Sequence, residues 1–79
     1  MHPEDIRKTI EARIPDAKAT VVDLTGGGDH FQAEIVSIAF AGKPIVQQHK
    51  MVYALFEREL TDGSLHALSL KTRVPPQPK

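Results

Sequence analysis

The chain contains no cysteine among its 79 residues. This absence excludes a disulfide, a thiol nucleophile and any thiolate metal ligand supplied by the chain itself. Chemistry with a soft metal must therefore come from its four histidines or from a partner protein.

Net charge and long apolar runs are also missing. Ten basic residues balance ten acidic ones, so no overall field draws the chain to nucleic acid or to a membrane surface. No apolar run approaches the roughly 20 residues of a membrane span. The N-terminal sequence M-H-P-E-D lacks the basic and apolar regions of a signal peptide. We therefore predict a cytoplasmic protein that does not associate with membranes.

What is present is ordinary globular composition, with 41% apolar and 25% charged residues. A chain of this length forms one small domain and buries only roughly 60% of its extended surface. The last residues are rich in proline, which cannot pair as a strand. We expect a single domain over residues 1–74 and a flexible Pro-rich tail over residues 75–79.

The stretch Lys43–Leu60 predicts a central amphipathic helix. Pro44 suits the first turn, where a missing N–H has no cost, and Gly63 suits the left-handed position after the helix end. Residues at steps of three and four form its apolar stripe, namely Ile45, His49, Val52, Phe56 and Leu60. Such a face must be covered by the flanking segments.

The remaining segments predict a second helix and three strands. Ile6, Ile10 and Ile14 recur every fourth residue and indicate a first helix over Pro3–Arg13. The expected strands are Lys18–Leu24, in which Thr20, Val22 and Leu24 alternate, Phe31–Ile38 with Phe31, Ala33 and Ile35 on one face, and Leu65–Thr72 with His66, Leu68 and Leu70 opposite Leu65, Ala67 and Ser69. The first two form an antiparallel hairpin, and the helix before the third permits a parallel crossover. The prediction is an α+β fold in the order α-β-β-α-β, with both helices on one face of a three-stranded mixed sheet.

Histidines are the most informative candidates for chemistry. His66 opens the third strand, where the sheet fixes its backbone while the ring stays near solvent, so it is a usable metal ligand or proton carrier. An ordinary polar residue at a strand end is the alternative interpretation. His30 flanks the hairpin loop, and a ligand and a surface residue are equally good interpretations. His49 lies in the apolar stripe and is interpreted as a half-buried structural residue.

No arrangement of residues predicts catalysis. There is no nucleophile–base motif and no H-x-x-x-H or H-E-x-x-H pair, and Asp23, Asp29 and Glu34 show no paired-carboxylate pattern. The three consecutive glycines lead into a strand and not into a helix N-terminus, which argues against a phosphate-binding loop. We expect a flexible hairpin loop in which Gly27 and Gly28 permit close approach of a partner's backbone.

Four motifs resemble those of the BolA-like family, and in particular its compact members with a short hairpin loop. They are G-G-G-D-H-F at Gly26–Phe31, I-V-S-I-A-F-A-G-K at Ile35–Lys43, V-Q-Q-H-K-M-V-Y at Val46–Tyr53 and L-H-A-L-S-L-K-T at Leu65–Thr72. The resemblance implies a fold related to the class II KH arrangement, with the second and third strands parallel. The GxxG loop by which KH domains clamp nucleic acid is absent from this sequence.

The resemblance also implies a role in iron–sulfur biology. Family members are non-enzymatic partners of monothiol glutaredoxins, with which they share a [2Fe–2S] cluster in cluster trafficking or iron sensing. His66 matches the family's near-invariant ligand, and His30 is the remaining candidate for the loop ligand, which in relatives often falls at positions matching Gly27 or Gly28. Gly27, Gly28, His49 and Lys50 are the expected partner contacts. The isolated chain is expected to be a monomer without cofactor, and the heterodimer to hold the cluster together with glutathione.

The alternative role in the family is transcriptional control of stress response and cell morphology. The helix pair would then resemble a helix-turn-helix, with Lys50, Lys71 and Arg73 contacting phosphates. Because the net charge is zero, we expect any DNA binding to be weak.

Overall fold

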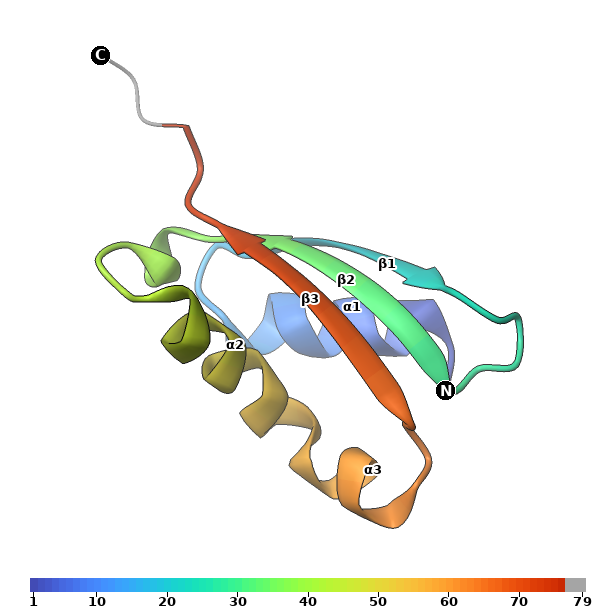
Figure 1. Cartoon of the computed structure of the whole chain (residues 1–79). Helices are drawn as coiled ribbons and strands as arrows, with labels where there is room; N and C mark the ends of the chain where they lie inside the picture. The colour runs from blue at the N-terminus through green and yellow to red at the C-terminus, as the bar shows by residue number, and fades with distance from the viewer. Residues whose placement is uncertain (77–79) are drawn as a thin grey trace.

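The computed structural model describes residues 1–76 of the chain. The elements are α1 (Pro3–Arg13), β1 (Lys18–Asp23), β2 (His30–Val36), η1 (Ile38–Phe40), α2 (Ile45–Tyr53), η2 (Ala54–Phe56), α3 (Glu57–Asp62) and β3 (Ala67–Arg73). The three strands form one curved layer and the helices lie together beneath it (Figure 1). The predicted two-layer α+β architecture is therefore confirmed.

The sheet is mixed, with the strand order β1-β2-β3. β1 and β2 pair antiparallel, whereas β2 and β3 pair parallel in a register that places His30 opposite Ala67. The central helical segment makes the crossover between the two parallel strands, as such a connection requires. This register matters for function because it brings the beginnings of β2 and β3 to the same end of the sheet.

Apolar side chains from α1 and β2 build the core. The predicted inward set Phe31, Ala33 and Ile35 is fully buried, as are Ile6 and Ile10 of α1. The other core members are Ile14, Ala17, Phe40, Val52, Phe56, Leu65 and Leu68. The bounds predicted for α1 and the inward face of β2 are therefore confirmed.

The opposite face of the sheet is exposed. Side chains of β1 alternate between the two faces of the sheet, as predicted. Thr20, Val22 and Leu24 lie on the solvent side, while Ala19 and Val21 pack against the core. In the described part of the chain every helix lies on the other face (Figure 1).

The central helix is not continuous, so the prediction of one helix over Lys43–Leu60 is wrong. α2 begins after Pro44 and ends at Tyr53, and a 3₁₀ turn then separates it from α3. The Tyr53 hydroxyl donates to the Leu68 carbonyl at 2.8 Å, and Phe56 is buried. Residues i and i+3 align in a 3₁₀ turn. The tightened turn therefore lets these two aromatic side chains face the rest of the fold together. The predicted end is confirmed, since Gly63 adopts a φ of 85°.

Two predictions about which residues face the core are also wrong. Ile45 was expected in the buried stripe but is 53% exposed, because α2 turns Gln48 inward at this end of the helix. Leu65 and Leu68 were expected on opposite faces of the strand, but both are buried. Regular pairing starts only at Ala67, so the strand alternation does not extend back to Leu65.

Val74–Pro76 form neither helix nor strand, and residues 77–79 of the predicted tail lie outside the described residues. Within residues 1–76, each helix is too short or too polar to span a lipid bilayer.

Candidate metal centre

The loop between β1 and β2 is organised by a carboxylate. The two side-chain oxygens of Asp23 accept hydrogen bonds from the backbone N–H groups of Thr25, Gly26 and Gly28 at 3.2, 2.9 and 3.0 Å. Gly26 and Gly28 have φ values of 77° and 75°, a region that strongly favours glycine. The glycine run is therefore a defined turn that delivers Asp29 and His30 to the start of β2.

Main-chain hydrogen bonds join this loop to the segment before β3. The carbonyl oxygen of Asp29 accepts from the backbone N–H groups of His66 and Ala67, at 2.9 and 3.1 Å. Because backbone groups make these bonds, the two segments are held together independently of their side chains. His66 is fixed next to the hairpin loop, as its position at the start of the third strand predicted.

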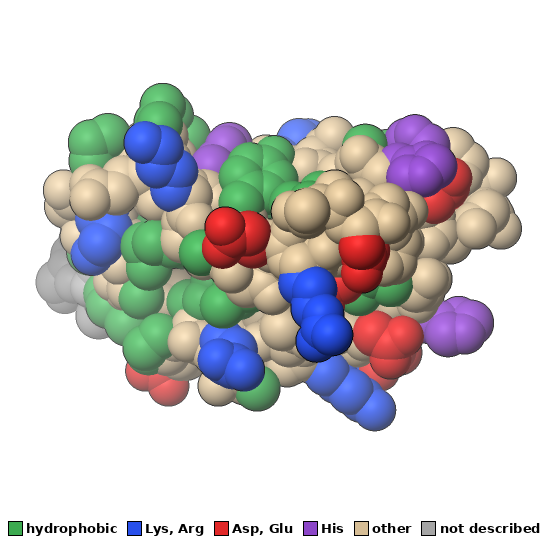
Figure 2. Space-filling view, turned by 90° about the horizontal axis from the view of Figure 1, so that it is seen from below, with side chains coloured by type: hydrophobic (Ala, Val, Ile, Leu, Met, Phe, Trp, Pro, Cys, Tyr) green, Lys and Arg blue, Asp and Glu red, His purple; other side chains and the backbone are tan. Residues whose placement is uncertain are grey.

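The two imidazoles of His30 and His66 are neighbours. Their ring centroids lie 5.7 Å apart with the planes perpendicular. The side chains are 41% and 58% exposed, so a second protein could reach both rings. Figure 2 shows histidine and acidic side chains adjoining at one end of the helical side of the molecule.

The carboxylate of Asp29 lies between the imidazoles. Its Oδ1 is 3.0 Å from Nδ1 of His30, and its Oδ2 is 3.3 Å from Nδ1 of His66. The imidazole of His30 is the main influence that holds the pKa of Asp29 below its ordinary value, with smaller contributions from the Thr25 hydroxyl and from His66. Asp29 is therefore an anionic neighbour of both rings.

Of the other predicted partner contacts, Gly27 lies at this site. A Cβ at Gly27 would meet Oδ1 of Asp29 at 3.2 Å, so this position faces the carboxylate. A Cβ at Gly28 would instead meet the carbonyl oxygen of Met1 at 3.0 Å, so Gly28 faces the N-terminal residue. His49 and Lys50 belong to α2, which begins beneath the far end of β3 (Figure 1). His49 is half-buried, and its Nε2 has no hydrogen-bond partner within residues 1–76. Whether these residues contact a partner stays a prediction.

The three basic residues proposed for DNA lie in two layers. Lys71 and Arg73 are on β3 and exposed, whereas Lys50 is exposed on α2 in the helical layer. The structure brings Lys71 and Arg73 together along one strand and leaves Lys50 separate from them. Whether they contact phosphates stays a prediction.

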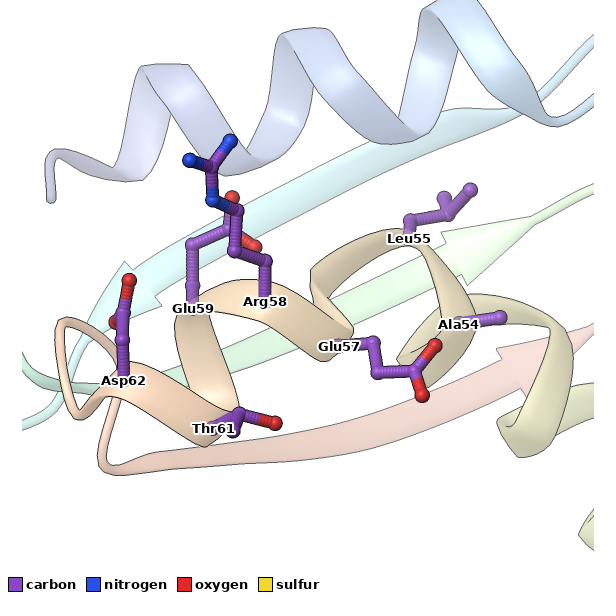
Figure 3. Close-up of a pocket in the computed structure, with 7 residues that line it drawn as sticks. All are labelled: Ala54, Leu55, Glu57, Arg58, Glu59, Thr61 and Asp62. Atoms are coloured by element: carbon purple, nitrogen blue, oxygen red, sulfur yellow. The ribbon is translucent and has the colours of Figure 1, made fainter.

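A depression of about 830 Å³ lies elsewhere, around η2 and α3. In Figure 3, Arg58, Glu59 and Asp62 extend to the side on which α1 lies, whereas Glu57 and Thr61 extend in another direction. These polar groups do not converge on one point, which a catalytic or small-ligand site requires. We therefore assign the candidate site to the histidine pair.

Sequence reasoning identified both histidines but missed the two aspartates of the loop. Asp23 and Asp29 were considered only as a catalytic carboxylate pair, whereas one holds the glycine turn and the other contacts both imidazoles. The adjacency of Asp29 and His30 in the sequence is a signal that could have pointed to the second role.

Comparisons with known proteins agree with the fold. The family model described as BolA-like protein matches residues 8–77. The Arabidopsis thaliana protein BOLA2 is 35% identical over 75 residues, which covers 94% of this chain and 78% of that protein. The solved BolA domain of SufE1 from the same plant superposes with a TM-score of 0.82 at 35% identity, covering 92% of this chain and 91% of that one. BolA1 from Arabidopsis thaliana gives the same TM-score at 28% identity, with 98% and 95% covered.

Proposed function

This chain belongs to the BolA-like family, and from that premise we propose that it is a non-enzymatic partner of a monothiol glutaredoxin. The two proteins share a [2Fe–2S] cluster, for which His66 and His30 are the ligands from this chain. The role of the complex is cluster trafficking or iron sensing in the cytoplasm.

The observation that carries the proposal is the pairing of two accessible imidazoles at one end of the sheet. They come from segments far apart in the sequence and are brought together by main-chain hydrogen bonds from His66 and Ala67 to Asp29. A pair fixed in this way needs little rearrangement to bind a metal, which lowers the entropic cost of ligation.

The donor set fits half of a cluster site. The chain has no thiolate, and [2Fe–2S] clusters are held mostly by cysteine, with two histidines able to replace two cysteines on one iron. Two imidazoles therefore complete one iron, and the thiolates come from the glutaredoxin and glutathione. Imidazole ligation would raise the reduction potential of the bound cluster.

The loop around Gly27 and Gly28 supports docking of a second protein. Without a side chain, Gly27 lets a partner's backbone approach the histidines closely. Each ring is roughly half exposed, so it remains available until that approach.

The test is reconstitution of the cluster with a monothiol glutaredoxin and glutathione, with and without this chain. We expect visible circular dichroism bands that differ from those of the glutaredoxin alone, and a 1:1 heterodimer in size-exclusion chromatography. His2→Ala is the matched control, because it removes an imidazole outside the site. Identical spectra with and without the chain, together with separate elution, would reject the proposal.

A further inference from the structure

Three potential ligand atoms from Asp29, His30 and His66 all lie within 4.8 Å of one another. Two of the separations are known individually, 3.0 Å for His30 Nδ1 to Asp29 Oδ1 and 3.3 Å for His66 Nδ1 to Asp29 Oδ2. Ligands of a tetrahedral ion with bonds of about 2.0–2.1 Å lie roughly 3.3 Å apart. Asp29 is therefore spaced from each imidazole as two ligands of one small ion are.

His30 and Asp29 are in close contact. Nδ1 of His30 is buried from solvent and lies 3.0 Å from Oδ1 of Asp29, an ion-pair distance when the imidazole is protonated. A deprotonated imidazole nitrogen and a carboxylate oxygen at this distance can both bind one ion.

A further contact orients the carboxylate, because the Thr25 hydroxyl donates to Oδ1 of Asp29 at 3.2 Å. The main-chain carbonyl of Asp29 also accepts from the backbone N–H of His66, which holds the two segments together. Support of this kind from neighbouring residues fixes ligands in the geometry that a metal requires.

We propose that the isolated chain binds one divalent transition-metal ion of the zinc class through Asp29, His30 and His66. Two imidazoles and one carboxylate suit zinc, cobalt or ferrous iron, whereas calcium and magnesium require sites made of oxygen. Three protein ligands leave one position of a tetrahedral ion open to water. This binding shares two residues with the proposed cluster site but needs no partner, and the ion and the cluster exclude each other.

The experiment is titration of the isolated chain with Co²⁺, followed by visible absorption and by competition with Zn²⁺. We expect absorption bands of four-coordinate cobalt that saturate at one ion per chain and vanish when zinc is added. Asp29→Asn keeps the shape of the side chain but removes the anionic ligand. Loss of a supporting residue already weakens metal binding about 10- to 100-fold, so loss of this ligand should weaken it on the order of 100-fold.

Asp62→Asn is the matched control, since this exposed carboxylate at the end of α3 accepts a hydrogen bond from the Ser64 backbone N–H and touches neither imidazole. It should bind cobalt as the unaltered chain does. Far-UV circular dichroism establishes that each variant is folded, and His30→Ala provides an independent loss of one ligand. The proposal is overturned if the unaltered chain shows no saturable cobalt bands, or if folded Asp29→Asn binds cobalt as tightly as the control.

Asp29→Asn also separates this proposal from the cluster function. The variant retains both imidazoles, so it should still form the cluster-bridged heterodimer while losing the cobalt site. A chain that binds cobalt but never forms the heterodimer would refute the proposed function and leave the cation site intact.

Discussion

The two ends of β3 each carry a polar cluster, and the clusters differ in how fully their polar atoms are satisfied. Next to the start of the strand, His66 joins Asp29 and His30 in an accessible group in which His30 Nδ1 contacts the Asp29 carboxylate without a well-aligned hydrogen bond. At its other end, Thr72 joins Gln48 in a group whose side-chain amide is completely hydrogen-bonded. α2 runs antiparallel to β3 between them, because Gln48 contacts Thr72 and Tyr53 contacts Leu68.

The Gln48 cluster has the features of a structural device. Its Oε1 accepts from the Thr72 hydroxyl at 2.6 Å, and its Nε2 donates to the Lys43 and Phe40 carbonyls at 2.8 and 3.4 Å. These bonds fix the start of α2 against β3 and satisfy carbonyls in the turn before the helix. Both N–H groups of the amide are therefore engaged within the chain and cannot donate to a ligand.

The comparison indicates which polar groups of a small domain can still bind a ligand. A satisfied buried polar group stabilises one conformation, while a group with free donor atoms near solvent keeps its capacity to bind. The histidine cluster should therefore respond to substitution mainly in binding, and the glutamine cluster mainly in stability.

The largest expected effect is that of His66→Ala on the heterodimer. The substitution removes a cluster ligand from a position where main-chain bonds hold the backbone, so folding should change little. Formation of the cluster-bridged complex with a monothiol glutaredoxin should fall by about 100-fold or more. Analytical size-exclusion chromatography and the cluster spectrum measure it. An unaltered heterodimer would contradict the proposal that the histidine cluster acts in binding and the Gln48 cluster in stability.

Gln48→Met should have the opposite signature. The side chain keeps its length but leaves the Lys43 carbonyl and the Thr72 hydroxyl without their partner, which costs about 2–3 kcal/mol of unfolding free energy. In a domain of this size that lowers the Tm by roughly 10 °C or more. Denaturant and thermal unfolding measure the loss, and cluster binding at low temperature should be retained. A variant as stable as the unaltered chain would contradict the structural role of Gln48.

His30→Ala should weaken cluster retention less than His66→Ala does. Its ring is one of two ligands from this chain, but it stands beside a loop where glutathione or water could replace it. We expect about a tenfold faster loss of the cluster to a chelator, followed by the decay of visible absorption. Equal effects of the two substitutions would show that the ligands are equivalent.

His49→Ala should act mainly on stability. The residue is half-buried on α2, and its Nε2 lacks a hydrogen-bond partner in the described structure. Truncation should cost about 1 kcal/mol from lost packing. His49→Leu fills the space without an unpaired nitrogen and should cost less, as measured by urea unfolding. A greater loss with leucine would indicate that the nitrogen has a favourable interaction.

Acid provides the smallest and most selective test. The pKa of Asp29 in the folded chain lies below its ordinary value of 3.8, chiefly through His30. Its contribution to stability is therefore present above that ordinary value and is lost as the pH falls through the lowered one. The stability difference between the unaltered chain and Asp29→Asn should shrink in acid, whereas the difference caused by Gln48→Met should not depend on pH. A difference for Asp29→Asn that persists at low pH would contradict this.

The fold was predictable where local pattern and burial agree. Ile6 and Ile10 on α1, and Phe31, Ala33 and Ile35 on β2, follow helical and strand periods that burial enforces. The break after Tyr53 could not be predicted, because it accompanies a hydrogen bond to Leu68, which is distant in the sequence.

The site, too, was predictable only where its features do not depend on contacts between residues distant in the sequence. The proposed ligand role of His66 was predicted from its place at the start of a strand and from the family motif. Its contact with Asp29 depends on the parallel register of β2 and β3, which no local pattern encodes. The hydrogen bond between Gln48 and Thr72 could not be predicted either, because the two residues are distant in the sequence. It turns Gln48 toward the fold, which leaves Ile45 of the predicted apolar stripe exposed.

The most direct test of the central claim is pulsed electron paramagnetic resonance of the reduced cluster, with only the histidines of this chain labelled with ¹⁵N. The account predicts two strongly coupled ¹⁵N nuclei in the heterodimer, one of which disappears in His66→Ala or His30→Ala and both of which persist in His49→Ala. A reduced cluster in the heterodimer with no ¹⁵N coupling would contradict it, because this chain would then bind the glutaredoxin without ligating the iron.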